Sequence, residues 1–353
     1  MNKKSEFRKL AALCVALFMT CMLMPVISAP ANAATEVSNE SELKEALERG
    51  ETDITITKAT TITINSLTIN SGVTLTVKGC VFTVNSGVTL TVQGTVTVDS
   101  DDYGITSGVI LNRGTIVNNG AISFNRGGIN NEGGTFTNNN GGTVTLDYFS
   151  TFTVGGGTID NRGTISTSSR IGINRGTLSN SGTLVLNGGG TIINKAELSN
   201  SGTINNGGII YNEDRGKIIN SGKIVNNGGT LNNGDTIDNG GTIDNEGGRI
   251  ANGGTINNIG GGKIINIDKG VFDNRGKVND NVSGGSSPSS DGKPNSPSAS
   301  VPSGVESIAP FSSDNAGDGG QSGVGGTALV GAVVGVILAV IGGCVLFLRK
   351  RKI

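Results

Sequence analysis

The sequence predicts an all-β fold, a parallel β-helix solenoid in which short strands stack coil upon coil. A unit of six to eight residues recurs from Gly108 to Asn279: Thr or Lys, then Ile or Leu, then an Asn-rich turn closed by Gly. One apolar residue per unit cannot form a core alone, but stacked units can. Gly makes up 58 of the 353 residues, and Gly and Asn suit corners because both tolerate the left-handed backbone region.

Composition excludes several classes of protein. The chain has no His and no Trp, and its formal net charge is -1. Without His, a His-based catalytic triad or a His-ligated metal is excluded. Near-zero charge argues against a nucleic-acid partner, which needs a basic face. Collagen is excluded because Gly does not fall on every third position, and the regular placement of Ile and Val indicates order.

Residues 1–33 are typical of a secretory signal peptide. A basic start that includes Lys3 and Arg8 precedes the apolar stretch Leu10–Ile27. Ala31-Asn32-Ala33 matches an A-x-A cleavage site, so we expect cleavage before Ala34.

Residues 34–53 predict a cap for the first coil. Within them Asn39–Gly50 is typical of a short amphipathic helix, with Asn39 as N-cap and Glu42 three residues later. Leu43, Ala46 and Leu47 would form its apolar face. A repeat protein needs such a cover over its open apolar end to stay soluble.

Residues 54–280 form the predicted solenoid. Ile54–Val98 alternates apolar residues with Thr, as in strands with one buried face. From the helix to Val98 the chain resembles the N-terminal entry of pectate-lyase-like right-handed β-helices on bacterial and archaeal surface proteins of adhesin type. The resemblance implies a right-handed solenoid, although the short repeats leave a left-handed helix open.

The coil length is predicted from internal alignment. Gly108–Ile116 aligns without a gap on Gly157–Ile165, 49 residues later, which suits two coils of ~24 residues. Farther on, the unit starts at Lys217, Lys223 and Thr236 indicate coils of about 20 residues. We therefore expect ~11 coils and a rod about 55 Å long.

The C-terminal part changes character after Asn281. Residues 281–326 are rich in Ser, Gly and Pro and predict a disordered spacer. Residues 327–348 are apolar and uncharged and predict one transmembrane helix, followed by a basic cytoplasmic tail, residues 349–353. Small residues that permit close helix packing, and so a homodimer, recur along one ridge of this helix. They are Thr327, Gly331, Gly335, Ala339 and Gly343.

Few residues suggest binding chemistry. Asp99, Asp101 and Asp102 form an acidic cluster of hard oxygen ligands that could hold Ca²⁺, and a solvated loop is the alternative. Cys80 is expected to be a buried apolar residue. For Tyr148 and Phe149, the aromatic pair that most suggests sugar binding, we expect burial in a wider coil.

Arginines in Asn-Arg-Gly units suggest a second kind of surface. They could form a cationic stripe for an acidic glycan, or they could be solvent-facing corner residues where any polar residue is accepted. Glu132 and Glu246 occupy the same position in other units, and this mixture of Arg and Glu favours ordinary corners. These arginines are Arg113, Arg126, Arg162, Arg175 and Arg275.

The sequence therefore predicts a cell-membrane protein with an extracellular solenoid, no catalytic activity and no cofactor. Its predicted role is adhesive or structural display toward glycans or surface proteins of other cells. The alternative is a polysaccharide lyase or hydrolase on the same fold, for which Asp99, Asp101 or Asp102 would have to converge with an Arg or Lys on one exposed face.

Overall fold

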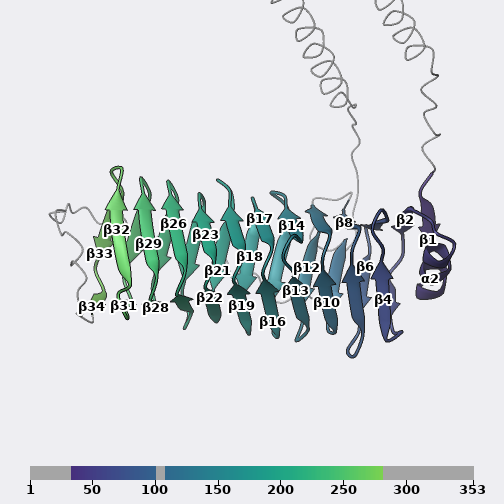
Figure 1. Cartoon of the computed structure of the whole chain (residues 1–353), viewed down its shortest axis with the longest axis horizontal. Helices are drawn as coiled ribbons and strands as arrows, with labels where there is room; N and C mark the ends of the chain where they lie inside the picture. Colours follow the sequence, from purple (N-terminus) through teal and green to yellow (C-terminus); the bar gives the residue numbers. More distant parts are fainter. Residues whose placement is uncertain (1–32, 101–107, 281–353) are drawn as a thin grey trace, which may run out of the picture. The chain divides into compact units, whose positions relative to one another are not determined.

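The computed structural model of the chain describes residues 33–100 and 108–280. In these residues, short parallel strands form three sheets that wrap into a solenoid of about eleven turns (Figure 1). Sheet A contains β1 (Thr35–Val37), β2 (Asp53–Ile56), β5 (Thr74–Lys78), β8 (Thr95–Asp99), β11 (Ala121–Asn125), β14 (Thr143–Leu146), β17 (Thr164–Thr167), β20 (Thr183–Leu186), β23 (Thr203–Asn206), β26 (Lys223–Asn227), β29 (Thr242–Glu246) and β32 (Lys263–Ile267).

The other two sheets contain eleven strands each. Sheet B contains β3 (Thr60–Ile62), β6 (Val81–Val84), β9 (Val109–Asn112), β12 (Gly128–Asn131), β15 (Thr151–Val154), β18 (Arg170–Ile173), β21 (Thr191–Asn194), β24 (Ile209–Asn212), β27 (Thr230–Asn233), β30 (Arg249–Asn252) and β33 (Val271–Asn274). Sheet C contains β4 (Ser66–Ile69), β7 (Thr89–Val92), β10 (Thr115–Asn118), β13 (Thr135–Asn138), β16 (Thr158–Asn161), β19 (Thr177–Asn180), β22 (Glu197–Asn200), β25 (Lys217–Asn220), β28 (Thr236–Asn239), β31 (Thr255–Asn258) and β34 (Lys277–Asp280).

Each coil passes through sheets A, B and C in turn, so three sequence units make one coil. A typical strand has four residues that face alternately outward and inward. In β20, for example, Leu184 and Leu186 are buried, whereas Thr183 and Val185 face outward. Leu184 lies in register between Ile165 and Ile204 of the neighbouring coils. The predicted parallel β-solenoid with stacked inward apolar residues is confirmed.

The prediction that the 49-residue offset corresponds to two coils is wrong. Ile110 stacks on Ile129 in sheet B, whereas Ile159, its counterpart in the alignment, stacks on Phe136 in sheet C. The aligned segments are alike because every sheet uses the same unit, so similar units recur on different sheets. In the region where shorter coils were predicted, Asn220, Asn239 and Asn258 stack 19 residues apart, which agrees with the predicted coils of about 20 residues.

The Asn residues of the repeat do not all serve as corners. In every strand from β21 to β33, the second inward residue is Asn. Asn180 and Asn200, in the preceding and following coils of sheet C, have no exposed area. The tolerance of Asn for the left-handed region predicts these residues in turns. The structure instead buries most of these amides, because their partners in adjacent coils satisfy them.

The amides form a ladder along each sheet, buried except at Asn266 and Asn274 of the last coil. Sheet B also has a separate pair, Asn112 and Asn131, which Val154 and Ile173 divide from its ladder. Each side-chain Nδ2 donates to the Oδ1 of the Asn in the next coil, over 2.6 Å at the shortest and 2.9 Å at the longest in sheet C. The sheet C ladder runs through Asn118, Asn138, Asn161, Asn180, Asn200, Asn220, Asn239 and Asn258. The sheet B ladder runs through Asn194, Asn212, Asn233, Asn252 and Asn274, and that of sheet A through Asn206, Asn226, Asn245 and Asn266.

The first coils use apolar residues where later coils use Asn. In sheet C the ladder position is Ile69 in β4 and Val92 in β7, both fully buried, before Asn118 begins the ladder. The solenoid thus has an apolar N-terminal core and a core of mixed Ile and Asn columns toward its C-terminal end.

Gly at the end of the unit is required mainly by close approach of adjacent coils. A Cβ atom on Gly202 would lie 2.2 Å from the backbone oxygen of Gly182, and one on Gly222 equally near Gly202. The φ angles of these three glycines are not in the left-handed region. The expectation that the repeat glycines serve positive φ is therefore wrong for this column, where a side chain would separate the coils.

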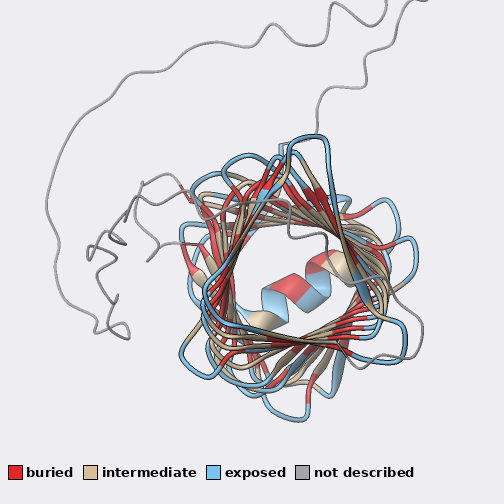
Figure 2. Ribbon diagram, turned by 90° about the vertical axis from the view of Figure 1, so that its left-hand side faces the viewer, coloured by how far each residue is buried: buried red, intermediate tan, exposed pale blue. Residues whose placement is uncertain are grey.

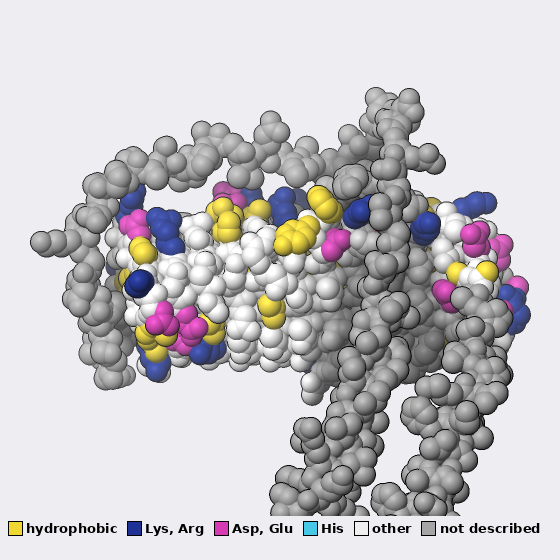
Figure 3. All heavy atoms as spheres, turned by 90° about the horizontal axis from the view of Figure 1, so that it is seen from above, with side chains coloured by type: hydrophobic (Ala, Val, Ile, Leu, Met, Phe, Trp, Pro, Cys, Tyr) yellow, Lys and Arg dark blue, Asp and Glu magenta, His cyan; other side chains and the backbone are white. Residues whose placement is uncertain are grey.

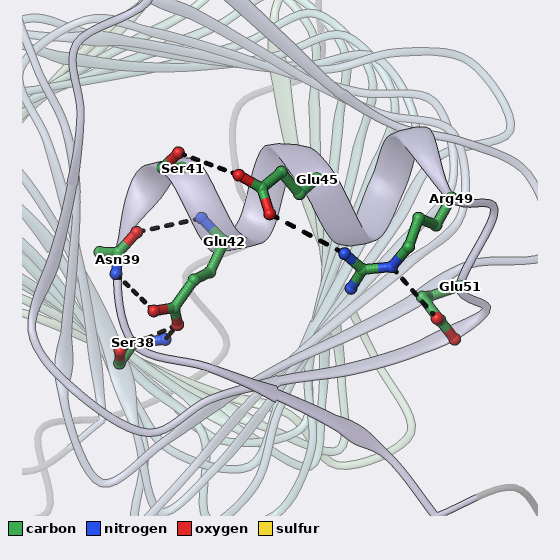
Figure 4. Close-up of polar contacts among 7 residues, drawn as sticks. All are labelled: Ser38, Asn39, Ser41, Glu42, Glu45, Arg49 and Glu51. Carbon is green, nitrogen blue, oxygen red and sulfur yellow. Dashed lines mark hydrogen bonds and ion pairs between the residues drawn. The ribbon is translucent and has the colours of Figure 1, made fainter.

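The predicted N-terminal cap is present as helix α2 (Glu40–Glu48), which lies across one end of the ring of sheets (Figure 2). Asn39 caps the helix, with its Oδ1 accepting from the backbone N–H of Glu42 at 3.0 Å. The Glu42 carboxylate in turn accepts from Ser38 and Asn39 (Figure 4). Leu43 and Ala46 are buried, as predicted. Strand β1, which joins sheet A ahead of α2, was not predicted.

Several predicted segments lie outside the described residues. They are the signal peptide up to residue 32, the spacer 281–326, the membrane helix 327–348 with its ridge of small residues, and the basic tail. Within residues 33–100 and 108–280, no helix combines the length and the apolar character needed to cross a membrane.

Candidate functional site

Charged side chains on the outer surface form pairs between adjacent coils. Lys217 Nζ lies 2.8 Å from Asp238, and Lys223 Nζ lies 2.7 Å from Asp244. Further pairs are Arg113–Glu132, Lys195–Asp214 and Arg249–Asp273. Because each cation faces an anion of a neighbouring coil, these charges neutralise one another along the rod.

Pairing also shifts the pKa values of the groups involved. The pKa of Asp238 lies below its ordinary value because Asn257 and Lys217 both donate hydrogen bonds to its carboxylate. The pKa of Lys217 is raised because its ammonium donates to Asp238. The pKa of Lys223 is raised for the same reason, because its ammonium donates to Asp244.

The arginines of the Asn-Arg-Gly units are spread over all three corners of the solenoid. Arg126 follows β11 between sheets A and B, and Arg162 follows β16 between C and A. The other three follow strands of sheet B at the corner between B and C: Arg113, Arg175 and Arg275. Arg113 pairs with Glu132, and Arg162 pairs with Asp160. The structure therefore supports the interpretation of these residues as ordinary solvent-facing corners.

The corner between sheets A and B carries an exposed aromatic pair, Tyr148 and Phe149. Tyr148 is 67% exposed and Phe149 56%, so the expectation that they are buried in a wider coil is wrong. They occupy the turn between β14 and β15, outside the stacked strands. This corner lies along the upper side of Figure 1, and Figure 3 views the molecule from that side.

The turn that carries the pair is held by its own hydrogen bonds. The Oδ1 atom of Asp147 accepts from the backbone N–H of Arg126 at 3.1 Å, from that of Phe149 at 3.2 Å and from Ser150 Oγ at 2.5 Å. Ser169 Oγ, in the next coil, donates to the backbone oxygens of Tyr148 and Ser150. The aromatic residues therefore sit on a turn tied to the coils on both sides.

Glycine makes room for the tyrosine ring. A Cβ atom on Gly189, two coils farther on, would lie 2.6 Å from Tyr148 Cε1. The ring thus occupies the space that a side chain at position 189 would fill. Asn187, just before Gly188, donates its amide to Ser166 Oγ at 3.2 Å and Ser168 Oγ at 3.4 Å. We call Tyr148, Phe149, Ser168, Asn187 and Gly189 the aromatic corner.

The predicted acidic metal site is described only in part. Asp99 lies at the end of β8, and its Oδ1 accepts from Asn125 Nδ2 at 2.8 Å. Its register partner in β5 is Lys78, and its backbone forms a bridge with Arg126. Asp101 and Asp102 lie outside the described residues. Among the described residues, no group of three acidic or Cys side chains is close enough to hold a metal ion.

Cys80 is buried, as predicted. Its thiol lies 3.5 Å from the backbone oxygen of Ile56, and burial raises the pKa of the thiol. A protonated thiol is a poor nucleophile, so Cys80 serves as a core residue.

Residue type marks Tyr148 and Phe149 as the aromatic pair that most suggests sugar binding, but the sequence predicts their burial inside a wider coil. The signal that could have placed them outside is the interruption of the unit: Asp147-Tyr148-Phe149-Ser150 stands between two complete strand patterns. Residues between strands of a solenoid belong to the corners, which face solvent.

No family model and no curated protein matches the chain. Among solved structures, the chain is similar to the crystal structure of a TibC-catalysed hyper-glycosylated fragment of TibA, with 20% sequence identity and a TM-score of 0.20. The match covers 69% of this chain and 97% of that one. At this low level the similarity supports no argument about function.

Proposed function

We propose that the chain is a non-catalytic surface protein that presents its solenoid outside the cell as an adhesive or structural rod. The observation that carries the proposal is the stacking of about eleven coils into one continuous body with three ladders of buried Asn. Such a body is quasi-one-dimensional, and the outward positions of its strands recur at each coil, most often with Thr as the first residue of the strand. A repeated surface suits contact with a repeated ligand, since many weak contacts add up to strong attachment.

Display at the membrane forms part of the proposal and rests on sequence. Residues 1–33 would direct export, residues 281–326 would separate the solenoid from the membrane, and residues 327–348 would anchor it with residues 349–353 inside. Protease added to intact cells should then remove an epitope placed in the solenoid but spare one placed after residue 353. Protection of the solenoid epitope in intact cells would overturn the proposed orientation.

Adhesion is tested with cells that produce the full chain. They are compared with cells that produce a chain lacking residues 54–280, so that export and anchoring signals are the same in both. We expect the full chain to increase cell clumping or retention on surfaces coated with polysaccharide or with other cells. Equal clumping and retention in the two strains, with equal surface amounts of both chains, would contradict the adhesive role.

A polysaccharide lyase is the second candidate because Asp99 lies in register with Lys78 and its backbone forms an isolated β-bridge with that of Arg126, so both basic residues are near it in the fold. A lyase would release unsaturated sugars from polygalacturonate, which are followed by ultraviolet absorbance. The proposed non-catalytic role predicts no product with calcium present. Product that disappears in Asp99→Asn, but not in Asp273→Asn, would favour the enzyme.

A further inference from the structure

We propose that the aromatic corner is a binding site for a neutral sugar ring, stacked on Tyr148 and Phe149. The inference rests on the proposed adhesive function and names its ligand class and its contact residues. The rings of this corner are exposed, its turn is held in a fixed geometry, and polar groups surround it.

The exposure of this pair is unusual among the aromatic residues of the described part of the chain. Other large aromatic residues, such as Phe124, Phe136 and Phe152, are buried to 2% exposure or less. Phe136 and Phe152 also pack edge to face inside the solenoid. Tyr148 and Phe149 each keep more than half of their surface exposed. Exposed aromatic surface gains less stabilisation than buried surface, and its position at one corner points to a role in binding.

The turn presents the rings in a fixed arrangement. Asp147 and Ser169 hold its backbone from both sides, and the ring of Tyr148 is seated over Gly189. A site that is already ordered loses little conformational entropy when a ligand binds. An ordered aromatic surface is therefore better suited to binding than a loose loop would be.

The chemistry of the neighbours favours a neutral sugar. A pyranose has an apolar C–H face that stacks on the electron-rich face of an aromatic ring, and hydroxyls around its edge. Ser168 and Asn187 supply neutral hydrogen-bonding groups that bond to each other. The backbone oxygen of Ser168 and the ring of Tyr148 both lie against the Cβ position of Gly189. Asp147 and Arg126 lie together at this corner and carry opposite charges, so these two residues give the corner no net positive charge that would favour an acidic sugar.

The experiment uses the full chain, purified in detergent, and immobilised β-1,4-glucose, α-1,4-glucose and β-1,4-N-acetylglucosamine oligosaccharides. Polygalacturonate is the acidic comparison. The test variant is Tyr148→Ser with Phe149→Ser. The matched control is Ile259→Ser, which removes another exposed apolar side chain at the corner between sheets C and A. Tyr148→Phe, which keeps the ring, is a second control.

We expect at least one neutral oligosaccharide to bind better than polygalacturonate, and the double variant to lose tenfold or more of that affinity. Ile259→Ser and Tyr148→Phe should retain it. Equal binding by the double variant and the wild type would overturn the inference, as would preference for polygalacturonate or no binding to any neutral oligosaccharide. Each of these results leaves the adhesive function standing, because the cell-adhesion assay tests that function without a chosen sugar.

The double variant also separates binding from self-association. If the aromatic corner contacts a second copy of the chain, the Tyr148→Ser, Phe149→Ser double variant should sediment more slowly than the wild type. Its sugar binding should then equal that of the wild type. That result overturns the inference. Matching strand-type circular dichroism of the variant and the wild type confirms that the solenoid is folded in each assay.

Discussion

The side-chain amide of Asn180 donates a hydrogen bond to the side-chain carbonyl of Asn200, 2.8 Å away in the next coil. The same Nδ2 also donates to the backbone oxygen of Thr203, at 3.1 Å, where the next strand of that coil begins. Each ladder amide thus joins two coils through a side chain and a corner. Buried polar groups are costly unless they are hydrogen-bonded. A shift of one coil against the next would break these hydrogen bonds, so the ladder favours a single register of stacking.

Because glycines of adjacent coils are in close contact at Gly202 but not at Gly188, one added methyl group should lower stability at the first position only. Gly202→Ala places a Cβ against the Gly182 oxygen and should force the coils apart, lowering the free energy of unfolding by about 2 kcal/mol. Gly188→Ala is the control, since its Cβ would meet nothing within 4 Å. Chemical denaturation of both variants measures the difference. A neutral Gly202→Ala would show that the coils are not in tight contact there.

The fold should require neither metal nor disulfide. We expect strand-type circular dichroism of residues 34–280 to be unchanged by EDTA and by reductant, because the described core is held by apolar stacking and by the Asn ladders. Cys80, its one thiol, is buried and free. A large loss of strand signal in EDTA would instead support the ion site at Asp99, Asp101 and Asp102.

Stability should be flat near neutral pH and fall at both extremes. Asp238 has a pKa below its ordinary value, so its contribution is present above about pH 4 and is lost as pH falls through the lowered value. Lys217 has a raised pKa, so its contribution is present below about pH 10 and is lost as pH rises through the raised value. The chain has no His to titrate between them.

Denaturation at a series of pH values checks this prediction, and Asp238→Asn should weaken the acid-dependent loss. A clear change in the free energy of unfolding between pH 5 and pH 8 would contradict this account of the charges.

The membrane helix is predicted to self-associate through its small residues. Thr327, Gly331, Gly335, Ala339 and Gly343 recur every fourth residue, and close backbone packing drives association in lipid. A reporter assay of helix dimerisation on residues 323–353 should lose its signal in Gly335→Ile. Val334→Ile, off the ridge, is the control. An unchanged signal in Gly335→Ile would mean that the ridge reflects composition alone.

Much of the fold could be predicted from the sequence, because the inward Ile of each unit and the cap at Asn39 depend on local pattern. The roles of Asn and Gly could not. Asn206 followed by Gly207 has the sequence of a turn, and only the stacking of Asn226 on it shows that its side chain is buried. Likewise, the need for Gly202 arises from Gly182, which lies in another coil.

The candidate site was harder to predict for the same reason. Tyr148 and Phe149 could be identified by their type, but their exposure depends on where the corners fall. Gly189, which makes room for Tyr148, is 41 residues later in the sequence and becomes its neighbour only through two turns of the solenoid.

Comparison of Asn200→Ala with Asn205→Ala in residues 34–280 shows whether the buried amides hold the coils together. Asn200 lies in the buried ladder and donates to Asn220 and to the backbone oxygen of Lys223, whereas Asn205, on the neighbouring strand, faces outward. Loss of the Asn200 amide leaves buried acceptors unpaired and opens a cavity, so we predict a loss of about 3 kcal/mol in the free energy of unfolding. Asn205→Ala should change it by less than about 0.5 kcal/mol. Equal effects of the two substitutions would contradict the claim that buried Asn ladders hold the coils together.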